Sequence, residues 1–335
     1  MGQIIGHQLA QDYLLRSIKE QNLAHAYLFS GPMGVGKATL VNFFIAKLNQ
    51  SKGETVDLNS PDILWLSLLE DKKDITIEQI RSVTEFLKLA SWFGQYRVVI
   101  IEEAERLSEE ASNALLKTLE EPLGRAMIIL ISSQPYRLLP TIVSRCQQIN
   151  LSPVNQQELQ PWLKGQVSVK DDLVSIIHLS QGCPGRALRL ATNPEILKQR
   201  VKQAHLFVTF IESKKAKEIN SWLKNELVSK KLSKESATDN KMIDLQNRGI
   251  NILSIWLEVT RDLLLCKYGQ TARVVYYVLL AKLQSLSGEL SSNNLLALMK
   301  VIRQALIKLQ SNANVKLTLE WVLISALGFN QNKVN

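Results

Sequence analysis

A glycine-rich loop of the form G-x-x-x-x-G-K reads Gly31-Pro32-Met33-Gly34-Val35-Gly36-Lys37-Ala38-Thr39. An apolar run of strand length, residues 24–29, precedes this loop, and apolar residues at helical spacing, residues 40–48, follow it. In this context the motif cradles phosphate, because converging backbone N–H groups and a helix N-terminus attract anions. The sequence therefore predicts a nucleotide-binding loop in which Lys37 reaches the terminal phosphates. An ordinary glycine-rich turn is the alternative.

One position departs from this motif. The residue after the lysine is usually Ser or Thr, whose hydroxyl holds Mg²⁺. Ala38 has no side-chain oxygen, and Thr39 comes one residue late, which turns its side chain by about 100° on a helix. We therefore expect the loop to accept ATP or ADP and to hold Mg²⁺ weakly.

Length and composition limit the class of protein. A chain of 335 residues predicts two or three domains. No run of 18 uncharged apolar residues occurs and the N-terminus lacks a signal-peptide pattern, so we expect no membrane span. The three cysteines, Cys146, Cys183 and Cys266, are far apart, which favours a cytoplasmic protein without a disulfide framework or a cysteine-ligated zinc ion.

The net charge of +9 is unevenly distributed. Residues 1–150 carry 15 Lys and Arg against 17 Asp and Glu, whereas residues 151–335 carry 25 against 14. A basic C-terminal half indicates nucleic acid or an acidic partner. Solvated helix faces are the alternative for any one lysine cluster.

Short apolar runs alternate with helical patterns through the N-terminal half. This alternation predicts a parallel sheet with helices on both faces, and ligands of such sheets bind at the carboxyl ends of the strands. The predicted strands after the first are residues 63–66, 97–101, 127–131 and 147–151.

Helix starts and faces can also be predicted. Thr76 with Gln79 forms a capping box, and Ser108 is a preferred N-cap residue followed by two acids. A helical pattern of apolar residues also precedes the loop and ends near Asn22. These apolar residues are Leu9, Tyr13, Leu14 and Ile18.

Two acidic residues stand directly after the strand at residues 97–101. At these positions phosphate-loop enzymes carry an acid that orients Mg²⁺ and a second acid that activates the attacking water. Glu102 is one methylene longer than the usual Asp, so its carboxylate is expected to lie out of place, whereas Glu103 matches the second position. Ser133, after the next strand, is a candidate contact for the γ-phosphate or the water. Two solvated acids at a strand end are the alternative.

From Ser152 onward the pattern is helical throughout. Residues 192–194, Thr-Asn-Pro, mark a domain boundary, and beyond it Trp256 and Trp321 are expected in the core rather than as stacking platforms. The lysine-rich residues 214–241 are expected to be exposed. The clearest bundle helices are predicted at residues 279–290 and 295–309.

Four segments together resemble the bacterial clamp-loader AAA+ family. They are the loop at residues 31–37, the strand and acids at residues 98–103, the block Asn113-Ala114-Leu115-Leu116-Lys117-Thr118-Leu119-Glu120-Glu121-Pro122, and the triplet Ser144-Arg145-Cys146. Their order and spacing are similar to the family over residues 1–190. The helical remainder is similar only in composition and length.

Within the family, the chain lacks residues that the gamma and tau motors use to hold metal ions, and in this it resembles the rigid stator subunit. Ala38 and Glu102 replace metal-linked residues, and residues 49–61 contain no cysteine for the motors' zinc module, so no zinc is predicted. The motors carry a sensor arginine at the position of Gly185. Arg186, one place later, is therefore only a candidate nucleotide contact.

The resemblance implies an architecture and a set of partners. It implies an AAA+ nucleotide-binding domain at residues 1–151, a helical lid at 152–195 and an all-α collar at 196–335. Five subunits, with gamma/tau and delta as neighbours, would form a ring that places the sliding clamp on primer-template DNA. Arg145 matches the arginine finger, which would act on a neighbouring subunit's ATP.

Three functions follow from these patterns. The first is a stator within a DNA polymerase III (nucleotidyltransferase) holoenzyme, with weak or absent ATPase activity of its own. The second is an active gamma/tau-type motor ATPase. The third is an unrelated phosphate-loop enzyme, such as a small-molecule kinase, in which the Ser-Arg-Cys and Leu-Glu-Glu-Pro matches would be accidental.

Overall fold

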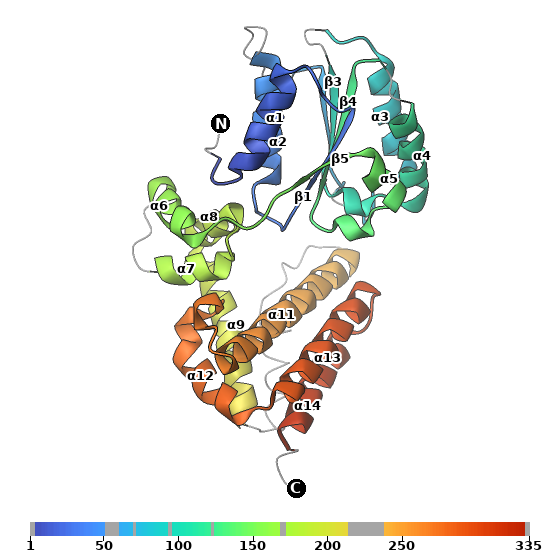
Figure 1. Cartoon of the computed structure of the whole chain (residues 1–335). Coiled ribbons are helices and arrows are strands. Elements are labelled where there is room, and N and C mark those ends of the chain that lie inside the picture. The colour runs from blue at the N-terminus through green and yellow to red at the C-terminus, as the bar shows by residue number, and fades with distance from the viewer. Residues whose placement is uncertain are drawn as a thin grey trace. The chain divides into compact units, whose positions relative to one another are not determined.

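The computed structural model divides the chain into two compact units (Figure 1). Unit 1 is Met1–Ser168 with Gly182–Arg189, and unit 2 is Val169–Gln181 with Leu190–Asn335. The three-part division expected from the sequence stays a prediction. No described helix combines the length and hydropathy that crossing a bilayer requires. The structure describes residues 4–50, 60–69, 72–92, 96–121, 124–167, 172–213 and 238–331.

Unit 1 is built on a five-stranded parallel sheet with the strand order β2-β3-β4-β1-β5. The predicted parallel sheet is thereby confirmed. The central strand pairs are in register from Ala26 opposite Ile128 to Ser30 opposite Ser132, so β1 and β4 end together. The strands are β1 (Ala26–Ser30), β2 (Ile63–Leu66), β3 (Arg97–Ile101), β4 (Ala126–Ser132) and β5 (Gln147–Asn150).

Helices cover both faces of this sheet, because strand side chains alternate between two apolar cores. Leu28 and Val99 belong to one core, and Tyr27 and Val98 belong to the other. Figure 1 shows α1 and α2 on one side of the sheet and α3, α4 and α5 on the other. The helices of unit 1 are α1 (Gln8–Lys19), α2 (Lys37–Gln50), α3 (Ile77–Lys88), α4 (Glu109–Glu120), α5 (Pro140–Arg145), α6 (Gln156–Gln166) and most of α8 (Pro184–Thr192).

Both predicted helix caps are confirmed. The backbone N–H of Thr76 donates to Gln79 Oε1 at 3.1 Å, completing the capping box of α3. The hydroxyl of Ser108 accepts a hydrogen bond from the Ala111 N–H at 3.1 Å at the start of α4. Each cap satisfies backbone donors that the first turn of a helix leaves unpaired.

Helix α1 is present where the apolar pattern before the loop predicts a helix, and its apolar residues are buried to different extents. Leu14 is fully buried and Ile18 is half-buried, but Leu9 is 88% exposed and Tyr13 is 40% exposed. The helix packs on α2 through a narrow stripe that includes Ser17, whose hydroxyl donates to the Tyr13 carbonyl. A polar residue is tolerated there because its hydroxyl is paired within the helix, which hydrophobicity alone does not indicate.

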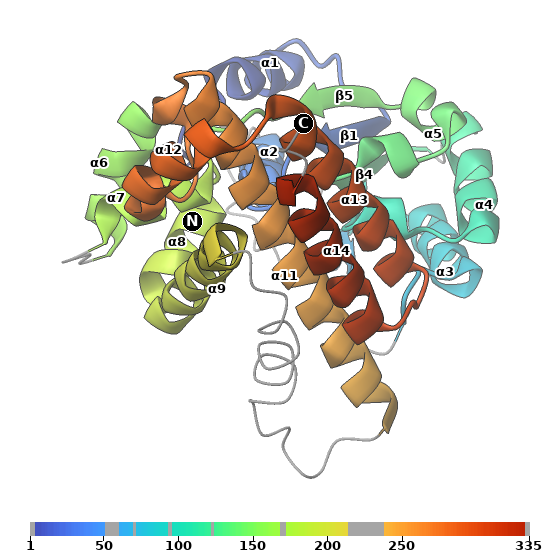
Figure 2. The ribbon, with the colours of Figure 1, turned by 90° about the horizontal axis from the view of Figure 1, so that it is seen from below.

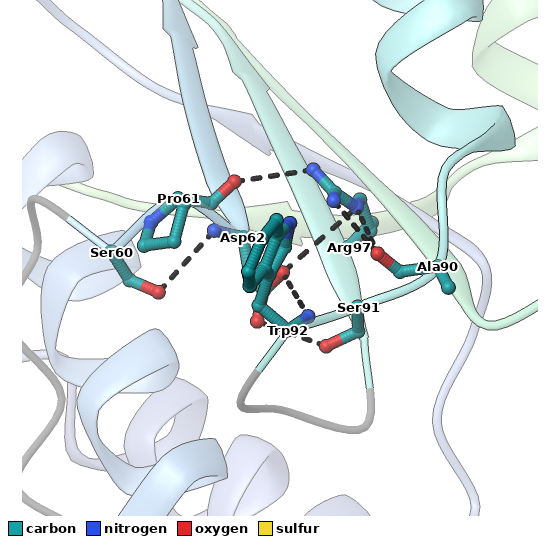
Figure 3. Close-up of polar contacts among 7 residues, drawn as sticks. All are labelled: Ser60, Pro61, Asp62, Ala90, Ser91, Trp92 and Arg97. Atoms are coloured by element: carbon teal, nitrogen blue, oxygen red, sulfur yellow. Dashed lines mark hydrogen bonds and ion pairs between the residues drawn. The ribbon is translucent and has the colours of Figure 1, made fainter.

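Arg97 joins the amino ends of β2 and β3 to the chain after α3 (Figure 3). Its guanidinium is buried and donates to the Ala90 carbonyl from Nε at 3.1 Å and Nη2 at 2.7 Å, and to the Pro61 carbonyl from Nη1 at 3.2 Å. The guanidinium also lies over the Phe86 ring, 4.6 Å from its centroid. Such a fork of donors can hold two loops at once, which an ammonium group does less well.

Asp62 balances this buried cation. Its Oδ1 lies 3.9 Å from Arg97 Nε and accepts the Trp92 N–H at 2.8 Å, while Oδ2 accepts the Ser91 hydroxyl at 2.9 Å. A buried ion pair is tolerated when further hydrogen bonds satisfy its remaining polar atoms, and this pair meets that condition. The network therefore holds the amino ends of β2 and β3 against the segment that follows α3 (Figure 3).

Unit 2 is a helical bundle in which α11 packs against α9, α12 and α13, and α13 packs against α14 (Figure 2). Trp256 is fully buried and stacks on Phe207 with ring centroids 4.8 Å apart, as predicted for a core residue, whereas Trp321 is half-buried under Lys308. The side chains of the lysine-rich residues 214–241 lie outside the described part of the chain. The helices are α7 (Leu173–Ser180), α9 (Pro194–Ser213), α11 (Thr238–Lys267), α12 (Leu280–Glu289), α13 (Ser292–Gln310) and α14 (Val315–Gln331), which confirms both predicted bundle helices.

Asp262 is a fully buried acid in α11. Its Oδ2 accepts the backbone N–H groups of Val275 at 2.9 Å and Tyr276 at 2.8 Å, whereas Oδ1 has no hydrogen-bond partner among the described residues. Burial raises the pKa of Asp262 to about 6, against the opposing effect of the two hydrogen bonds. Because the folded-state pKa is raised, the carboxyl stabilises unit 2 fully only below its unfolded pKa of about 4, and this contribution is lost as the pH rises through 6.

We expect Asp262→Asn to remove this pH dependence, because an amide keeps the acceptor oxygen and does not ionise. From about pH 4 to about pH 7, the free energy of unfolding of the unmodified chain should fall relative to the variant by up to about 3 kcal/mol. Urea unfolding across this range measures the difference. Asp12→Asn, at an exposed position of α1, is the control. Its free energy of unfolding should change with pH in the same way as that of the unmodified chain. A pH-independent difference for Asp262→Asn would contradict the prediction.

Candidate functional site

The glycine loop leaves the carboxyl end of β1 between two other strands. The N–H of Gly31 donates to the Ser132 carbonyl of β4 at 3.3 Å, and the N–H of Leu151 after β5 donates to the Ser30 carbonyl at 2.8 Å. A Cβ atom at Gly31 would lie 2.4 Å from the Leu151 carbonyl oxygen, so only glycine fits. The loop ends as α2 begins at Lys37, which is the strand–loop–helix context that the motif requires.

Lys37 turns back onto its own loop. Its Nζ donates to the carbonyls of Gly31 at 2.6 Å and Pro32 at 3.0 Å, and the residue is only 8% exposed. Burial lowers the pKa of Lys37, and the negative charge of Glu105 acts in the opposite direction. The ammonium group therefore has protein carbonyls as partners in this structure.

The outer side of the loop packs against the start of α8. The Gly185 N–H donates to the Gly34 carbonyl at 2.8 Å, and a Cβ at Gly34 would lie 3.0 Å from the Arg186 nitrogen. His7 Nε2 lies 3.0 Å from the Val35 carbonyl oxygen on another side. The structure thus brings Arg186 beside the loop through its backbone.

The remaining loop positions differ in exposure. Ala38 is half-buried and packs against the core beneath α2, whereas Thr39 is exposed. The two side chains therefore face different directions, as a one-residue shift on a helix predicts. Met33 at the tip of the loop is 71% exposed, and Gly36 has a φ of +112°.

The two acids after β3 do not act as a matched pair. Glu102 is half-buried, and burial followed by the charge of Glu103 raises its pKa. Glu103 has a left-handed backbone with φ +46°, and its Oε2 lies 2.7 Å from Arg106 Nε. The carboxylate at the predicted water-activating position is therefore paired with an arginine on the surface.

Ser133, after β4, contacts an acid that the sequence analysis did not single out. Its N–H and its hydroxyl both donate to Glu105 Oε1, at 3.1 Å and 2.5 Å. Burial favours the neutral form of Glu105, but hydrogen bonds from Ser133 and Ser132 outweigh it and lower the pKa. An anionic carboxylate therefore lies beside the residue expected to contact a terminal phosphate.

Arg145 lies on the other face of the sheet, at the end of α5. Its Nη2 is 2.7 Å from Glu120 Oε1 of α4, and its Nη1 donates to the Thr141 carbonyl at 3.1 Å. The Arg145 side chain is 35% exposed. These partners belong to α4 and α5, which cover the face of the sheet opposite to α2, the helix that follows the glycine loop.

Glu105 and Glu120 are the side chains that sequence reasoning missed. Glu105 falls in a 3₁₀ turn, Ala104–Arg106, that begins after Glu102 and Glu103. This tight turn brings the Glu105 side chain back to the ends of the strands, where it contacts Ser133. Glu120 lies in the Leu-Glu-Glu-Pro block already quoted, one helix turn from Lys117. Among the described residues, no group of three or more His, Cys, Asp or Glu side chains could hold a metal ion.

Comparison with known proteins identifies relatives. Residues 6–155 match the family model described as DNA polymerase III, delta subunit. A DNA polymerase III subunit delta' of Pseudomonas aeruginosa is 37% identical over 183 residues, which cover 50% of this chain and 56% of that protein, so the match spans about half the relative's length. The subunit delta' of Bacillus subtilis is 26% identical over 326 residues, 93% of each chain.

The fold has a counterpart among solved structures. A DNA polymerase III gamma subunit-related protein of Thermotoga maritima superposes with a TM-score of 0.51 at 19% identity, over 96% of this chain and all of that one. This likeness agrees with the fold expected for the family.

We expect Gly31→Ala to destabilise unit 1 strongly, since the new Cβ would lie 2.4 Å from the Leu151 carbonyl oxygen at a φ of +147°. The loss should be on the order of 3 kcal/mol in the free energy of unfolding. Gly124→Ala is the matched control, because Gly124 has φ +55° and its added Cβ would have no described atom within 4 Å, and it should cost about 1 kcal/mol. Equal losses by urea unfolding would show that the close approach does not matter.

Proposed function

Since the chain belongs to the clamp-loader AAA+ family, we propose that it acts as the delta-prime (stator) subunit of a DNA polymerase III clamp loader. The observation that carries this proposal is the contrast between two cations. Lys37 is buried on carbonyls of its own loop, whereas the guanidinium of Arg145 reaches the surface. A subunit built in this way is suited to assist catalysis elsewhere rather than to hydrolyse ATP itself.

Arg145 would serve as the arginine finger of a neighbouring ATPase subunit. A guanidinium is permanently charged and forked, so it can stabilise charge that develops on a γ-phosphate. In the free chain, Glu120 and the Thr141 carbonyl hold two of its nitrogens. Both contacts are at a partly exposed site, so a phosphate that carries more charge can replace the Glu120 carboxylate.

The loop at residues 31–37 would bind ATP or ADP only if Lys37 is released from its carbonyl partners. The backbone fits a nucleotide, because glycines with positive φ and the N-terminus of α2 supply the N–H groups that cradle phosphate. Mg²⁺ would be held weakly, since Ala38 supplies no oxygen and Glu102 is one methylene longer than the usual Asp. The Glu103 carboxylate, at the water-activating position, is paired with Arg106. Hydrolysis by this subunit is therefore expected to be weak or absent.

The partners follow from the proposed role. Gamma/tau and delta subunits would be the neighbours in a five-membered cytoplasmic ring, and the ring would place the sliding clamp on primer-template DNA. The excess of Lys and Arg in residues 151–335 favours an acidic partner or nucleic acid on that half. A gamma/tau-type motor is the second candidate, because α2 begins at Lys37 as in active phosphate loops.

We predict that Arg145→Ala lowers the DNA- and clamp-stimulated ATPase activity at one site of a reconstituted loader by roughly 10³-fold, because the transition-state charge loses its cation. The measurement uses rings in which every other ATP site is inactivated. Arg145→Lys keeps the charge and loses the fork, so it should recover little of the activity.

Arg125→Ala is the matched control for this experiment. It removes the same charge from an exposed arginine just before the amino end of β4, whereas the glycine loop lies at the carboxyl ends of the strands. We expect normal turnover from it. Unchanged turnover with Arg145→Ala would reject the finger, and brisk Mg²⁺-dependent hydrolysis by the isolated chain would favour the motor.

Membership of the ring is tested separately. We expect the unmodified chain and Arg145→Ala to co-purify equally with gamma/tau and delta subunits, since a finger acts on the transition state rather than on assembly. Mass measurement of the complex gives the subunit count. Absence of this chain from the complex would reject the proposed function.

A further inference from the structure

Glu105 places a negative charge where the glycine loop and β4 meet. Gly31 donates to the Ser132 carbonyl, so the next residue, Ser133, stands beside the start of the loop. Ser133 in turn holds Glu105 Oε1 with both its N–H and its hydroxyl. The carboxylate is thereby fixed by a short chain of backbone contacts that begins at the loop itself.

This carboxylate is electrostatically linked to the loop lysine. Glu105 is one of the groups whose charge acts on Lys37. Its second oxygen, Oε2, is buried and has no hydrogen-bond partner in the described part of the chain. Glu105 is anionic at neutral pH, because the hydrogen bonds from Ser133 and Ser132 outweigh the effect of burial on its pKa. A second anion would meet repulsion here that water screens only in part.

The phosphates of a bound nucleotide would feel this charge unequally. In a loop of this type the backbone N–H groups cradle the inner phosphates, while the lysine and a polar residue at the neighbouring strand end reach the terminal one. Glu105 lies with these last two groups, on the side of Ser133 and within the field of Lys37. The terminal phosphate of a triphosphate therefore carries most of the repulsion, and a diphosphate avoids it.

We propose that Glu105 makes the glycine loop selective for a nucleoside diphosphate over a triphosphate, by occupying the region of the terminal phosphate with its own carboxylate. The inference rests on the proposed function only in taking the loop to be a nucleotide site. It adds a ligand class and names the residue that sets it. In a ring, such a subunit would stay bound to the diphosphate while its neighbours bind and hydrolyse ATP.

Calorimetry on the full chain tests this selectivity, with ADP and ATP titrated at equal ionic strength without Mg²⁺. We expect the unmodified chain to bind ADP at least tenfold more tightly than ATP. Glu105→Gln removes the charge and keeps the shape and an acceptor for the Ser133 N–H. It should reduce the ADP preference at least tenfold, through tighter ATP binding, with ADP affinity changed less than about threefold.

One further variant controls for the loss of an exposed negative charge. Glu85→Gln, on exposed α3 and paired with Lys88, is the matched control and should bind like the unmodified chain. Thermal unfolding of each variant shows whether unit 1 remains folded.

The outcomes that overturn the inference are specific. They are equal affinity of the unmodified chain for ADP and ATP, no binding of either nucleotide, or a preference that Glu105→Gln leaves unchanged. None of these results tests the proposed role in the ring, because the Arg145 experiment measures ATP hydrolysis at the site of a neighbouring subunit. Conversely, loss of the Arg145 effect would leave the ADP preference of the isolated chain intact.

Discussion

The close approach of backbone to backbone around the glycine loop is the constraint on which unit 1 depends. At Gly31 the carbonyl of Leu151 occupies the space of a side chain, and at Gly34 the start of α8 does so. These contacts join the ends of β1, β4 and β5 to the first residue of α2. The positions of Lys37 and Ser133 follow from this junction. The geometry of the site therefore depends on glycine at positions 31 and 34, where a side chain would clash with neighbouring backbone.

Much of this architecture could be predicted because its causes are local in the sequence. The strands are continuous apolar runs, and their alternation with helical patterns allows only a parallel sheet with covered faces. The caps at Thr76 and Ser108 require residues within one helical turn. The loop and its lysine are recognisable because the motif and its flanks are contiguous. The bundle helices of unit 2 followed from periodicity in the same way.

The remainder depends on contacts between distant segments or on which face a helix presents. Glu105 contacts Ser133 across 28 positions, and no local pattern links them. The inward turn of Lys37 is a choice between partners that the motif does not specify. Leu9 and Tyr13 of α1 are exposed although they belong to its apolar pattern, because only a narrow stripe of the helix packs on α2. Sequence patterns locate candidate groups, and tertiary contacts decide their partners.

The buried Arg97 at the other edge of the sheet has a consequence for substitution (Figure 3). Its three nitrogens donate to carbonyls on two separate connecting segments, and Asp62 accepts the N–H of Trp92, which lies on the same segment as Ala90. Lysine at position 97 would keep the charge but could not reproduce this hydrogen-bond geometry. Replacing both Arg97 and Asp62 by neutral residues would leave buried main-chain carbonyl oxygens without hydrogen-bond donors. The Arg97 guanidinium and the Asp62 carboxylate therefore act as one unit. A substitution of either residue requires compensating changes in the connecting segments that the two side chains hold.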